Sequence, residues 1–328
     1  MKELAIIIPA FKIAYLDKVF ECIIHQTSKE FTLYVFDDNS PYPIKDMFDR
    51  FFASWNNAYY YRFDNNLGGK DLAAHWKRCV EYSGNEEWVW LFSDDDLMTE
   101  DCVEQILYAL RNNQDRIDDV LHFDICQIDG LGNVERIMPS YPQNISASDY
   151  YALLHTGKID TRMPEFIFRR SKLRNIGGYV SFDLAWKSDN ATVTAMTFPG
   201  TIYTLPKGMV SWRLSNKNVT GTYIDEAGEE RKYRATVDYH NWTYNFFRNN
   251  KVPFGMTKRQ LFISYLSNSK KRWIYYLNKS DIQELIDAYD ATKIFSNKIY
   301  FYWVWISENM RMTRKILWPK RLWFLLFS

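Results

Sequence analysis

The sequence predicts an α/β fold: a mostly parallel sheet with helices on both faces, followed by a helical C-terminal extension. Over roughly the first 130 residues, short apolar runs alternate with segments whose apolar residues recur every three or four positions. That alternation is typical of strands and helices that succeed each other along a parallel sheet. From about residue 230 the pattern is helical alone. The 328 residues suffice for one large domain with a substantial appendage.

The strands and helices of the first half follow each other in turn. The predicted strands cover 4–8, 32–36, 58–63, 88–92 and 120–128. Pro9 ends the first of them, and Asp129-Gly130 forms a turn after the last. The helices between them are marked by apolar stripes at Leu16, Val19, Phe20, Ile23 and Ile24, at Leu72, Trp76, Cys79 and Val80, and at Val103, Ile106, Leu107 and Leu110.

Beyond about Ser146 the predicted elements are shorter. A strand over 165–168 precedes a brief helix over 171–176, which Gly177-Gly178 closes. A further helix begins near Asp189, with Asp189 or Asn190 as its N-cap. Strands over 201–205 and 209–214 follow it.

Composition and charge exclude several classes of protein. The net charge of +1 gives no general attraction to nucleic acid. Cys22, Cys79, Cys102 and Cys126 form no CxxC pair, and the histidines show no ligand spacing, so we expect reduced thiols and no zinc site. The N-terminus lacks the features of a signal peptide. No apolar stretch reaches the roughly 18 residues that span a bilayer, so we expect a cytoplasmic protein.

Two acidic clusters stand at the ends of predicted strands: Asp37-Asp38 and Asp94-Asp95-Asp96. Ligands of parallel sheets bind beyond the carboxyl ends of the strands, where these clusters would meet. Carboxylates there could hold Mg²⁺ or Mn²⁺, which would neutralise a departing diphosphate. Taken alone, the triplet also fits a helix start that Asp96 or Thr99 caps, and Asp-Asn-Ser fits an ordinary turn.

A set of short segments extends this interpretation. They are Ile6-Ile7-Ile8-Pro9-Ala10-Phe11, Gln26-Thr27, Asp37-Asp38-Asn39-Ser40, Asn66-Leu67-Gly68-Gly69, Ser93-Asp94-Asp95-Asp96, Gly177-Gly178-Tyr179 and Ser188-Asp189. In this order and spacing, over roughly residues 4–215, the chain resembles a family 2 glycosyltransferase of the GT-A fold. The resemblance implies a Rossmann-like catalytic domain over 1–225 and a helical extension over 226–328. Within the domain, 1–128 would be the nucleotide-binding half and 129–225 the half that binds the acceptor and carries the catalytic base.

The resemblance also implies roles for single residues toward a UDP-sugar donor and Mn²⁺ or Mg²⁺. Asp95 and Asp96 would lie closest to the metal and the diphosphate, with Asp94 near the ribose. Asp38 would bind the uracil or the ribose. The full donor-binding set is Pro9, Ala10 and Phe11 around the nucleobase, together with Asp38, Gly69, Asp94 and Asp95.

Asp189 matches the acidic catalytic base of the family. An inverting transfer needs a carboxylate that takes the proton of the acceptor hydroxyl while its oxygen attacks the anomeric carbon, in line with the departing diphosphate. Asp183 is the nearby alternative, and we favour Asp189. A helix N-cap is the structural role open to Asp189, and the two roles can coexist.

The chain departs from the family pattern at two places in its first half. Lys12 stands where the family usually has Asn, and Ala74-His75-Trp76-Lys77-Arg78 stands where many relatives carry an Arg-Asn pair. No phosphate-binding arginine is therefore assigned in that helix. Arg213, Ser215 and Asn218 lie in a stretch that could close over the diphosphate or form a surface loop.

Residues 298–328 combine aromatic and basic side chains. Counting Lys298, six basic residues face one acidic residue, Glu308, and the segment also carries the aromatic runs 299–306 and 322–327. This pattern fits a segment that lies in the interface of the inner leaflet and brings the enzyme to a lipid-linked acceptor. It fits equally a helix that packs on the catalytic domain or forms a homodimer.

The sequence thus predicts an inverting, metal-dependent glycosyltransferase that moves a sugar from a UDP-sugar to a glycan or lipid-linked acceptor. Surface polysaccharide assembly, such as that of lipopolysaccharide or capsule, is the expected pathway. A nucleotidyltransferase of related fold is one alternative, although Pro9-Ala10-Phe11-Lys12 is not the Gly-rich loop it would need. A catalytically degenerate glycan-binding or scaffold protein is another, and retention of both acidic clusters and Asp189 argues against it.

Overall fold

A computed structural model describes residues 3–215, 226–257 and 260 of the chain. The described residues up to Ala235 belong to one compact unit, and a second unit begins at Thr236. The acidic clusters and Asp189 all lie in the first unit. Asn218 and the segment 298–328 lie outside the described residues.

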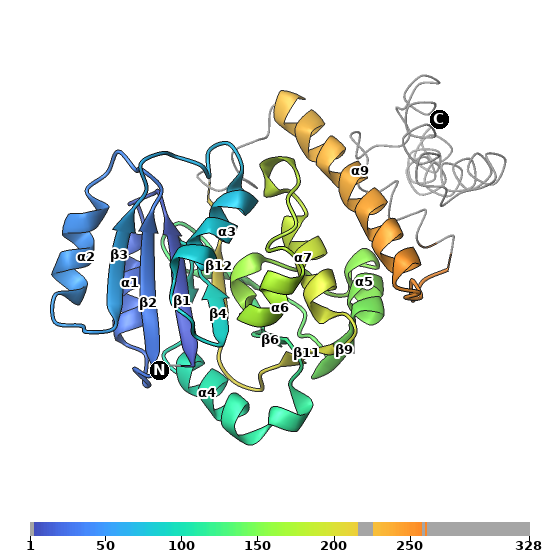
Figure 1. The fold of residues 1–328 in the computed structure, drawn as a ribbon, viewed down its shortest axis with the longest axis horizontal. Helices are drawn as coiled ribbons and strands as arrows, with labels where there is room; N and C mark the ends of the chain where they lie inside the picture. The colour runs from blue at the N-terminus through green and yellow to red at the C-terminus, as the bar shows by residue number, and fades with distance from the viewer. Residues whose placement is uncertain (1–2, 216–225, 258–259, 261–328) are drawn as a thin grey trace, which may run out of the picture. The chain divides into compact units, whose positions relative to one another are not determined.

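An eight-stranded sheet runs through the described part of the first unit (Figure 1). Its strand order is β3-β2-β1-β4-β10-β6-β11-β9. The first four of these strands are parallel, whereas β10 and β9 run antiparallel to their neighbours. The bounds are β1 (Leu4–Ala10), β2 (Phe31–Asp37), β3 (Ala58–Arg62), β4 (Trp88–Leu91), β6 (Val120–His122), β9 (Asn144–Ser146), β10 (Phe166–Arg169) and β11 (Thr201–Thr204).

Helices cover both faces of this sheet, as predicted. Alternate residues of β1 point to opposite faces, so Leu4, Ile6 and Ile8 enter one core while Ala5 and Ile7 enter the other. The helical side chains of the first core come from α1 (Leu16–Ile24), α2 (Ile44–Phe52) and α4 (Cys102–Asn112). Those of the second core come from α3 (Leu72–Tyr82), α5 (Ala147–His155), α6 (Arg170–Asn175) and α7 (Ser188–Thr197).

A second, smaller sheet has the strand order β5-β12-β7-β8, and its strand β5 directly follows the acidic triplet along the chain. Its strands are β5 (Leu97–Met98), β7 (Ile125–Ile128), β8 (Val134–Ile137) and β12 (Val210–Arg213). The single strand predicted over 120–128 is therefore two strands, β6 and β7, in two different sheets. Because β5 directly follows Asp96 and pairs with β12, the small sheet fixes one end of the acidic turn.

Three local predictions were wrong. Pro9 does not end β1, since it still pairs with Phe36 of β2. On the edge of β1 that faces β4, the pairing ends at Ile7. Pro9, which has no N–H, therefore interrupts no hydrogen bond between these two strands. Neither Asp96 nor Thr99 caps α4, whose N-cap is Asp101. Neither Asp189 nor Asn190 caps α7, whose N-cap is Lys187.

Other local predictions are confirmed. Gly177 and Gly178 follow α6 with φ of 90° and 97°, the left-handed conformation that ends helices. The four cysteines are free thiols. The helices α2 and α5 and the strands β5, β8 and β9 were not predicted.

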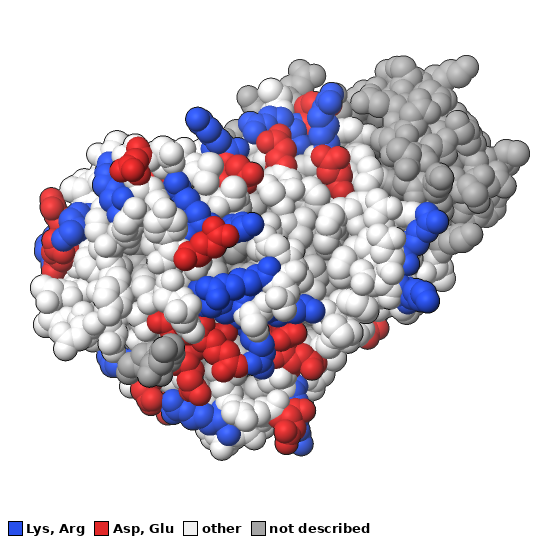
Figure 2. All heavy atoms as spheres, viewed as in Figure 1, with Lys and Arg blue, Asp and Glu red and all other residues white. Residues whose placement is uncertain are grey.

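The helix α9 (Glu226–Asn249) crosses the boundary between the two units. Within the second unit, the rings of Tyr244 and Phe247 pack against Phe254, with centroids 6.0 and 5.0 Å apart. Across the described ranges, no helix combines the length and the apolar character needed to cross a membrane. On the face drawn in Figure 2, Lys and Arg side chains are interspersed with Asp and Glu, so this face offers no broad basic surface of the kind that binds nucleic acid.

Candidate functional site

The loop after β1 is bound to the acidic turn, which we define as residues 93–96. The backbone N–H groups of Phe11 and Lys12 donate to Asp94 Oδ2 at 3.0 and 2.8 Å. Asp94 is 5% exposed, and burial raises the pKa of its carboxyl while Lys12 opposes that rise. Asp94 thus joins the loop after β1 to the turn after β4, across 83 residues of the chain.

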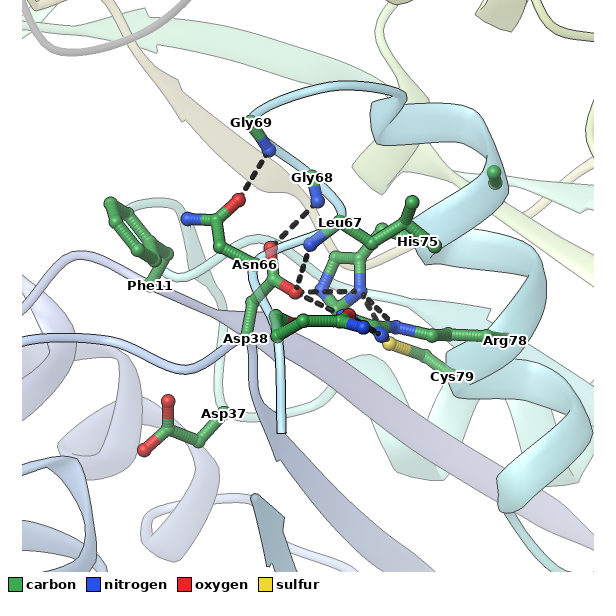
Figure 3. Close-up of polar contacts among 12 residues, drawn as sticks. Phe11, Asp37, Asp38, Asn66, Leu67, Gly68, Gly69, His75, Arg78 and Cys79 are labelled. Atoms are coloured by element: carbon green, nitrogen blue, oxygen red, sulfur yellow. Dashed lines mark hydrogen bonds and ion pairs between the residues drawn. The ribbon is translucent and has the colours of Figure 1, made fainter. Parts of the chain in front are cut away.

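Asp38 ties the end of β2 to the loop 66–69 (Figure 3). Its carboxylate accepts the backbone N–H of Leu67 at 3.0 Å and that of Gly68 at 2.7 Å. Arg78 of α3 donates to Asp38 Oδ1 as well, and its guanidinium lies 3.8 Å from the ring centroid of Phe63. The backbone N–H of Asp38 in turn donates to the carbonyl of Ala10 at 2.9 Å. Asp38 therefore organises the predicted nucleotide loops at their common edge.

Asp37 points away from Asp38 and has a structural role (Figure 3). It is fully buried and accepts the Tyr60 hydroxyl at 2.6 Å, the Arg62 guanidinium at 2.7 Å and the backbone N–H of Ser40 at 2.7 Å. The Ser40 hydroxyl donates to the carbonyl of Phe11 at 2.6 Å. Phe11 itself is 37% exposed, so its ring is open to a ligand.

The other end of the acidic turn is held by Arg213 of β12. Its backbone N–H donates to Asp96 Oδ1 at 2.7 Å, and its Nε donates to the carbonyl of Asp95 at 2.7 Å. Burial and the neighbouring Asp95 raise the pKa of Asp96 well above its ordinary range. Arg213 is 2% exposed, so it lies in the interior and does not form a surface loop.

A lysine ammonium lies on the acidic turn. Lys12 Nζ is 2.5 Å from Asp95 Oδ2 and 3.1 Å from Asp94 Oδ1, while the hydroxyl of Ser93 donates to the other Asp95 oxygen at 2.6 Å. Burial lowers the pKa of Lys12, but the two carboxylates outweigh that effect and raise it. The lysine is therefore firmly protonated in the folded protein.

The arrangement does not fit the divalent ion that Asp95 and Asp96 were expected to hold. Among the described residues, no three acidic, histidine or cysteine side chains gather as a metal-binding group. Both oxygens of Asp95 are already bonded to Lys12 and Ser93, and one oxygen of Asp96 is bonded to Arg213. The expected pair of metal ligands stays a prediction, without support from the contacts of these carboxylates.

Asp189 lies in the first turn of α7, behind a strained loop. Leu184, Ala185 and Lys187 have φ of 58°, 49° and 70°, a left-handed conformation that such residues seldom adopt and that gathers at functional sites. Burial raises the pKa of Asp189, and the nearby Lys187 opposes this rise. The alternative base, Asp183, accepts two hydrogen bonds from the Arg231 guanidinium, at 2.8 and 2.7 Å. Of the two carboxyls, Asp189 is the one not held by a bidentate arginine.

Arg162 connects the surroundings of Asp189 to the small sheet. Its guanidinium lies 4.2 Å from the ring centroid of Trp212, the residue before Arg213, and donates to Asp160 at 2.7 Å. The negative charges of Asp160 and Asp189 raise the pKa of Arg162 against its burial. The loop before α7 also meets the nucleotide half, because the hydroxyl of Ser181 donates to Asp71 at 3.0 Å.

The structure thus brings most, but not all, of the predicted site residues together. Hydrogen bonds connect the predicted donor-binding residues Ala10, Phe11, Asp38 and Asp94, whereas Asp189 is related to them only through intermediate residues. Ala10 is fully buried, so it can offer a nucleobase little more than backbone. Pro9 is half-buried, and Gly69 is exposed and donates its N–H to Asn66 Oδ1 at 2.6 Å.

Two cations of this region, Lys12 and Arg162, were not predicted as site residues. For Lys12, the sequence signal was its departure from the family's Asn. For Arg162, the signal was only its place two residues after Asp160.

Comparison with known proteins identifies the family and the fold. The family model for glycosyl transferase family 2 matches residues 5–177, more than half of the chain. No curated protein matches the chain.

Three solved structures share the fold. TarS 1-349 of S. aureus in complex with UDP-GlcNAc has 15% identity and a TM-score of 0.51, over 89% of this chain and 88% of that one. GalNAc-T7 with UDP, GalNAc and Mn²⁺ has 13% identity and a TM-score of 0.51, over 95% of this chain and 57% of that one. The mannosyltransferase PcManGT from Pyrobaculum calidifontis in complex with GDP-Man and Mn²⁺ has 12% identity and a TM-score of 0.51, over 94% and 87%.

Proposed function

The chain belongs to glycosyl transferase family 2 and has the GT-A fold, and on this premise we propose that it transfers a sugar, with inversion, from a UDP-sugar donor to a glycan or lipid-linked acceptor. The nucleotide would bind at the edge formed by residues 9–12, 37–40, 66–69 and the acidic turn. UDP accompanies two of the structurally similar proteins and GDP-Man a third, which supports a nucleotide-sugar donor.

The observation that carries this proposal is the hydrogen-bond network of those four segments. Asp94 binds the loop after β1, Asp38 binds both the last residue of β1, Ala10, and Gly68, and Ser40 binds Phe11. Preorganised loops at the carboxyl edge of parallel strands are where sheets of this kind bind ligands. The exposed ring of Phe11 offers a flat apolar surface to a nucleobase.

In the proposed reaction, Asp189 takes the proton of the acceptor hydroxyl. The hydroxyl oxygen forms a bond to the anomeric carbon, and the bond from that carbon to the diphosphate oxygen breaks with its electron pair. A raised pKa suits a carboxylate that must accept a proton near neutral pH. The nucleoside diphosphate leaves with one more negative charge than it carried in the donor, and positive groups must stabilise that charge.

Divalent-ion assistance was expected from Asp95 and Asp96, and Mn²⁺ accompanies two of the structurally similar proteins. The contacts of the acidic turn do not favour such an ion, so no step of the proposed reaction is routed through it. A role in surface polysaccharide assembly, at the inner face of the cytoplasmic membrane and with contact through 298–328, completes the proposal.

A thermal-shift screen of nucleotide sugars, with and without Mn²⁺, tests the donor class. We expect UDP-sugars to raise the Tm more than adenosine or cytidine analogues, because a bound ligand stabilises the folded state. The best donor is then assayed for UDP release with glycan acceptors. Binding without UDP release for any acceptor would instead favour a catalytically degenerate glycan-binding protein.

A further inference from the structure

We propose that the Lys12 ammonium, held on Asp94 and Asp95, supplies the positive charge that stabilises the donor's diphosphate, so that the enzyme needs no divalent ion. The inference rests on the proposed function, because it requires a nucleoside diphosphate at the edge where Lys12 lies. It concerns the acidic turn, where Asp95 was expected to bind a metal but instead contacts Lys12 and Ser93.

Lys12 is fixed at both of its ends. Its backbone N–H donates to Asp94 Oδ2 at 2.8 Å, and its ammonium contacts Asp95 Oδ2 at 2.5 Å and Asp94 Oδ1 at 3.1 Å. A charged group placed in advance loses little freedom when the ligand arrives, which is the condition for effective electrostatic stabilisation. The lysine is thus positioned before any donor binds.

The ammonium keeps a donor for the ligand. Of its three N–H groups, Asp94 and Asp95 account for two. The side chain of Lys12 is 28% exposed, against 6% and 5% for the two carboxylates, so it is the member of the group that solvent or a ligand reaches. Lysine binds phosphate oxygens as a compact point charge, and its neighbour Phe11 is exposed on the same loop.

The same lysine disfavours a metal. A divalent ion on Asp95 would have to displace the ammonium from an oxygen 2.5 Å away, or accept its repulsion at close range. An uncharged residue at position 12 would leave one oxygen of each carboxylate, Asp94 Oδ1 and Asp95 Oδ2, open to a cation. A single substitution of Lys12 should therefore convert a site that uses an ammonium group into one that binds a divalent ion.

Lys12 is a charge-stabilising group in this account, and it gives up no proton. The electron pair of the broken carbon–oxygen bond moves to the diphosphate oxygen, the hydroxyl proton goes to Asp189, and the ammonium stays charged throughout.

The first test is calorimetric titration of the full chain with UDP, in EDTA and then in excess MnCl₂. We expect the wild-type Kd for UDP to change by less than about threefold between the two conditions, and the turnover of the best donor likewise. Binding of UDP that requires Mn²⁺ would overturn the inference and leave the proposed function intact. If UDP binds in neither condition, the proposed function fails, and the inference fails with it.

The second test uses Lys12→Met, with Lys18→Met as the matched control. Lys18 is an exposed lysine of α1 paired with Glu21, so its loss makes the same charge change away from the site. In EDTA we expect Lys12→Met to bind UDP about 10–100-fold more weakly than wild type and the control to bind normally. Added Mn²⁺ should restore most of the lost affinity in Lys12→Met alone.

Electron paramagnetic resonance of free Mn²⁺ gives a readout that needs no donor. Lys12→Met should take up Mn²⁺, whereas wild type should take up little. Equal UDP binding by wild type and Lys12→Met in EDTA would contradict the inference. If Lys12→Met does not fold, Lys12→Arg keeps the charge and should bind UDP within about fivefold of wild type in EDTA, and loss of that binding in the folded variant would also count against the inference.

Discussion

The carboxylate of Asp38 accepts the backbone N–H of Gly68 at 2.7 Å, and this bond joins the end of β2 to the loop that follows β3. A methyl group on residue 68 would stand 2.7 Å from Asp38 Oδ2 and 3.3 Å from the His75 ring. Both neighbours are buried, and both accept hydrogen bonds from Arg78, so neither can move without cost. Residue 68 must therefore be glycine, because the carboxylate of Asp38 leaves no room for a side chain.

Gly68→Ala should accordingly weaken UDP binding by about tenfold or more, because a shift of Asp38 disturbs the loops on either side. Calorimetric titration with UDP measures the effect. Gly130→Ala is the control, since its added methyl would meet only the Tyr15 hydroxyl, at 3.2 Å. Unchanged affinity in Gly68→Ala would mean that Asp38 and its loop do not shape the nucleotide site.

Arg213→Met should destabilise the protein by about 2–4 kcal/mol, because the carbonyls of Asp95 and Asp129 would lose charged donors in a buried setting. Urea unfolding gives the change in free energy. Arg111→Met removes an exposed arginine paired with Glu3 and Glu30, and should change stability by less than about 1 kcal/mol. Equal effects of the two substitutions would show that Arg213 does not hold the acidic turn.

Asp189→Asn should keep UDP affinity within about threefold of wild type and lower the turnover of the donor by about 10²–10⁴-fold, since the amide cannot accept the proton. Asp183→Asn is the matched control, because its carboxylate is already engaged by Arg231. Steady-state assays of UDP release distinguish the two. Full activity in Asp189→Asn, with loss in Asp183→Asn, would reassign the base.

The pH dependence of kcat should reflect the raised pKa of Asp189. A base must be deprotonated to act, and burial makes Asp189 hold its proton to a higher pH than an ordinary aspartate. Activity should therefore fall on acidification at a pH above the usual aspartate range of about 4. A kcat that stays constant down to that range, with UDP still bound, would argue against Asp189 as the base.

Much of the fold could be predicted because local patterns decide it. The apolar stripe of α1 and the continuous apolar run of β1 each predict the observed element. The sequence did not show that the run over 120–128 forms two strands, because its apolar character continues through Phe123, which lies between them. Only the pairing of β6 with β10 and of β7 with β12 places its halves in separate sheets.

The site was predicted less completely, because its decisive contacts join distant parts of the chain. The sequence places the acidic triplet at a strand end, but the ion pair of Lys12 with Asp95 spans 83 residues. The start of α7 was misplaced because Lys187, rather than a small polar residue, takes the capping position with a positive φ. Local capping rules do not anticipate a lysine in that conformation.

The measurement that tests the nucleotide site most directly is a crystal structure of the chain with UDP, grown in EDTA. We expect the uracil to lie beside Phe11 and a diphosphate oxygen to lie within about 3 Å of Lys12 Nζ. UDP bound away from residues 9–12, 66–69 and the acidic turn would contradict this expectation.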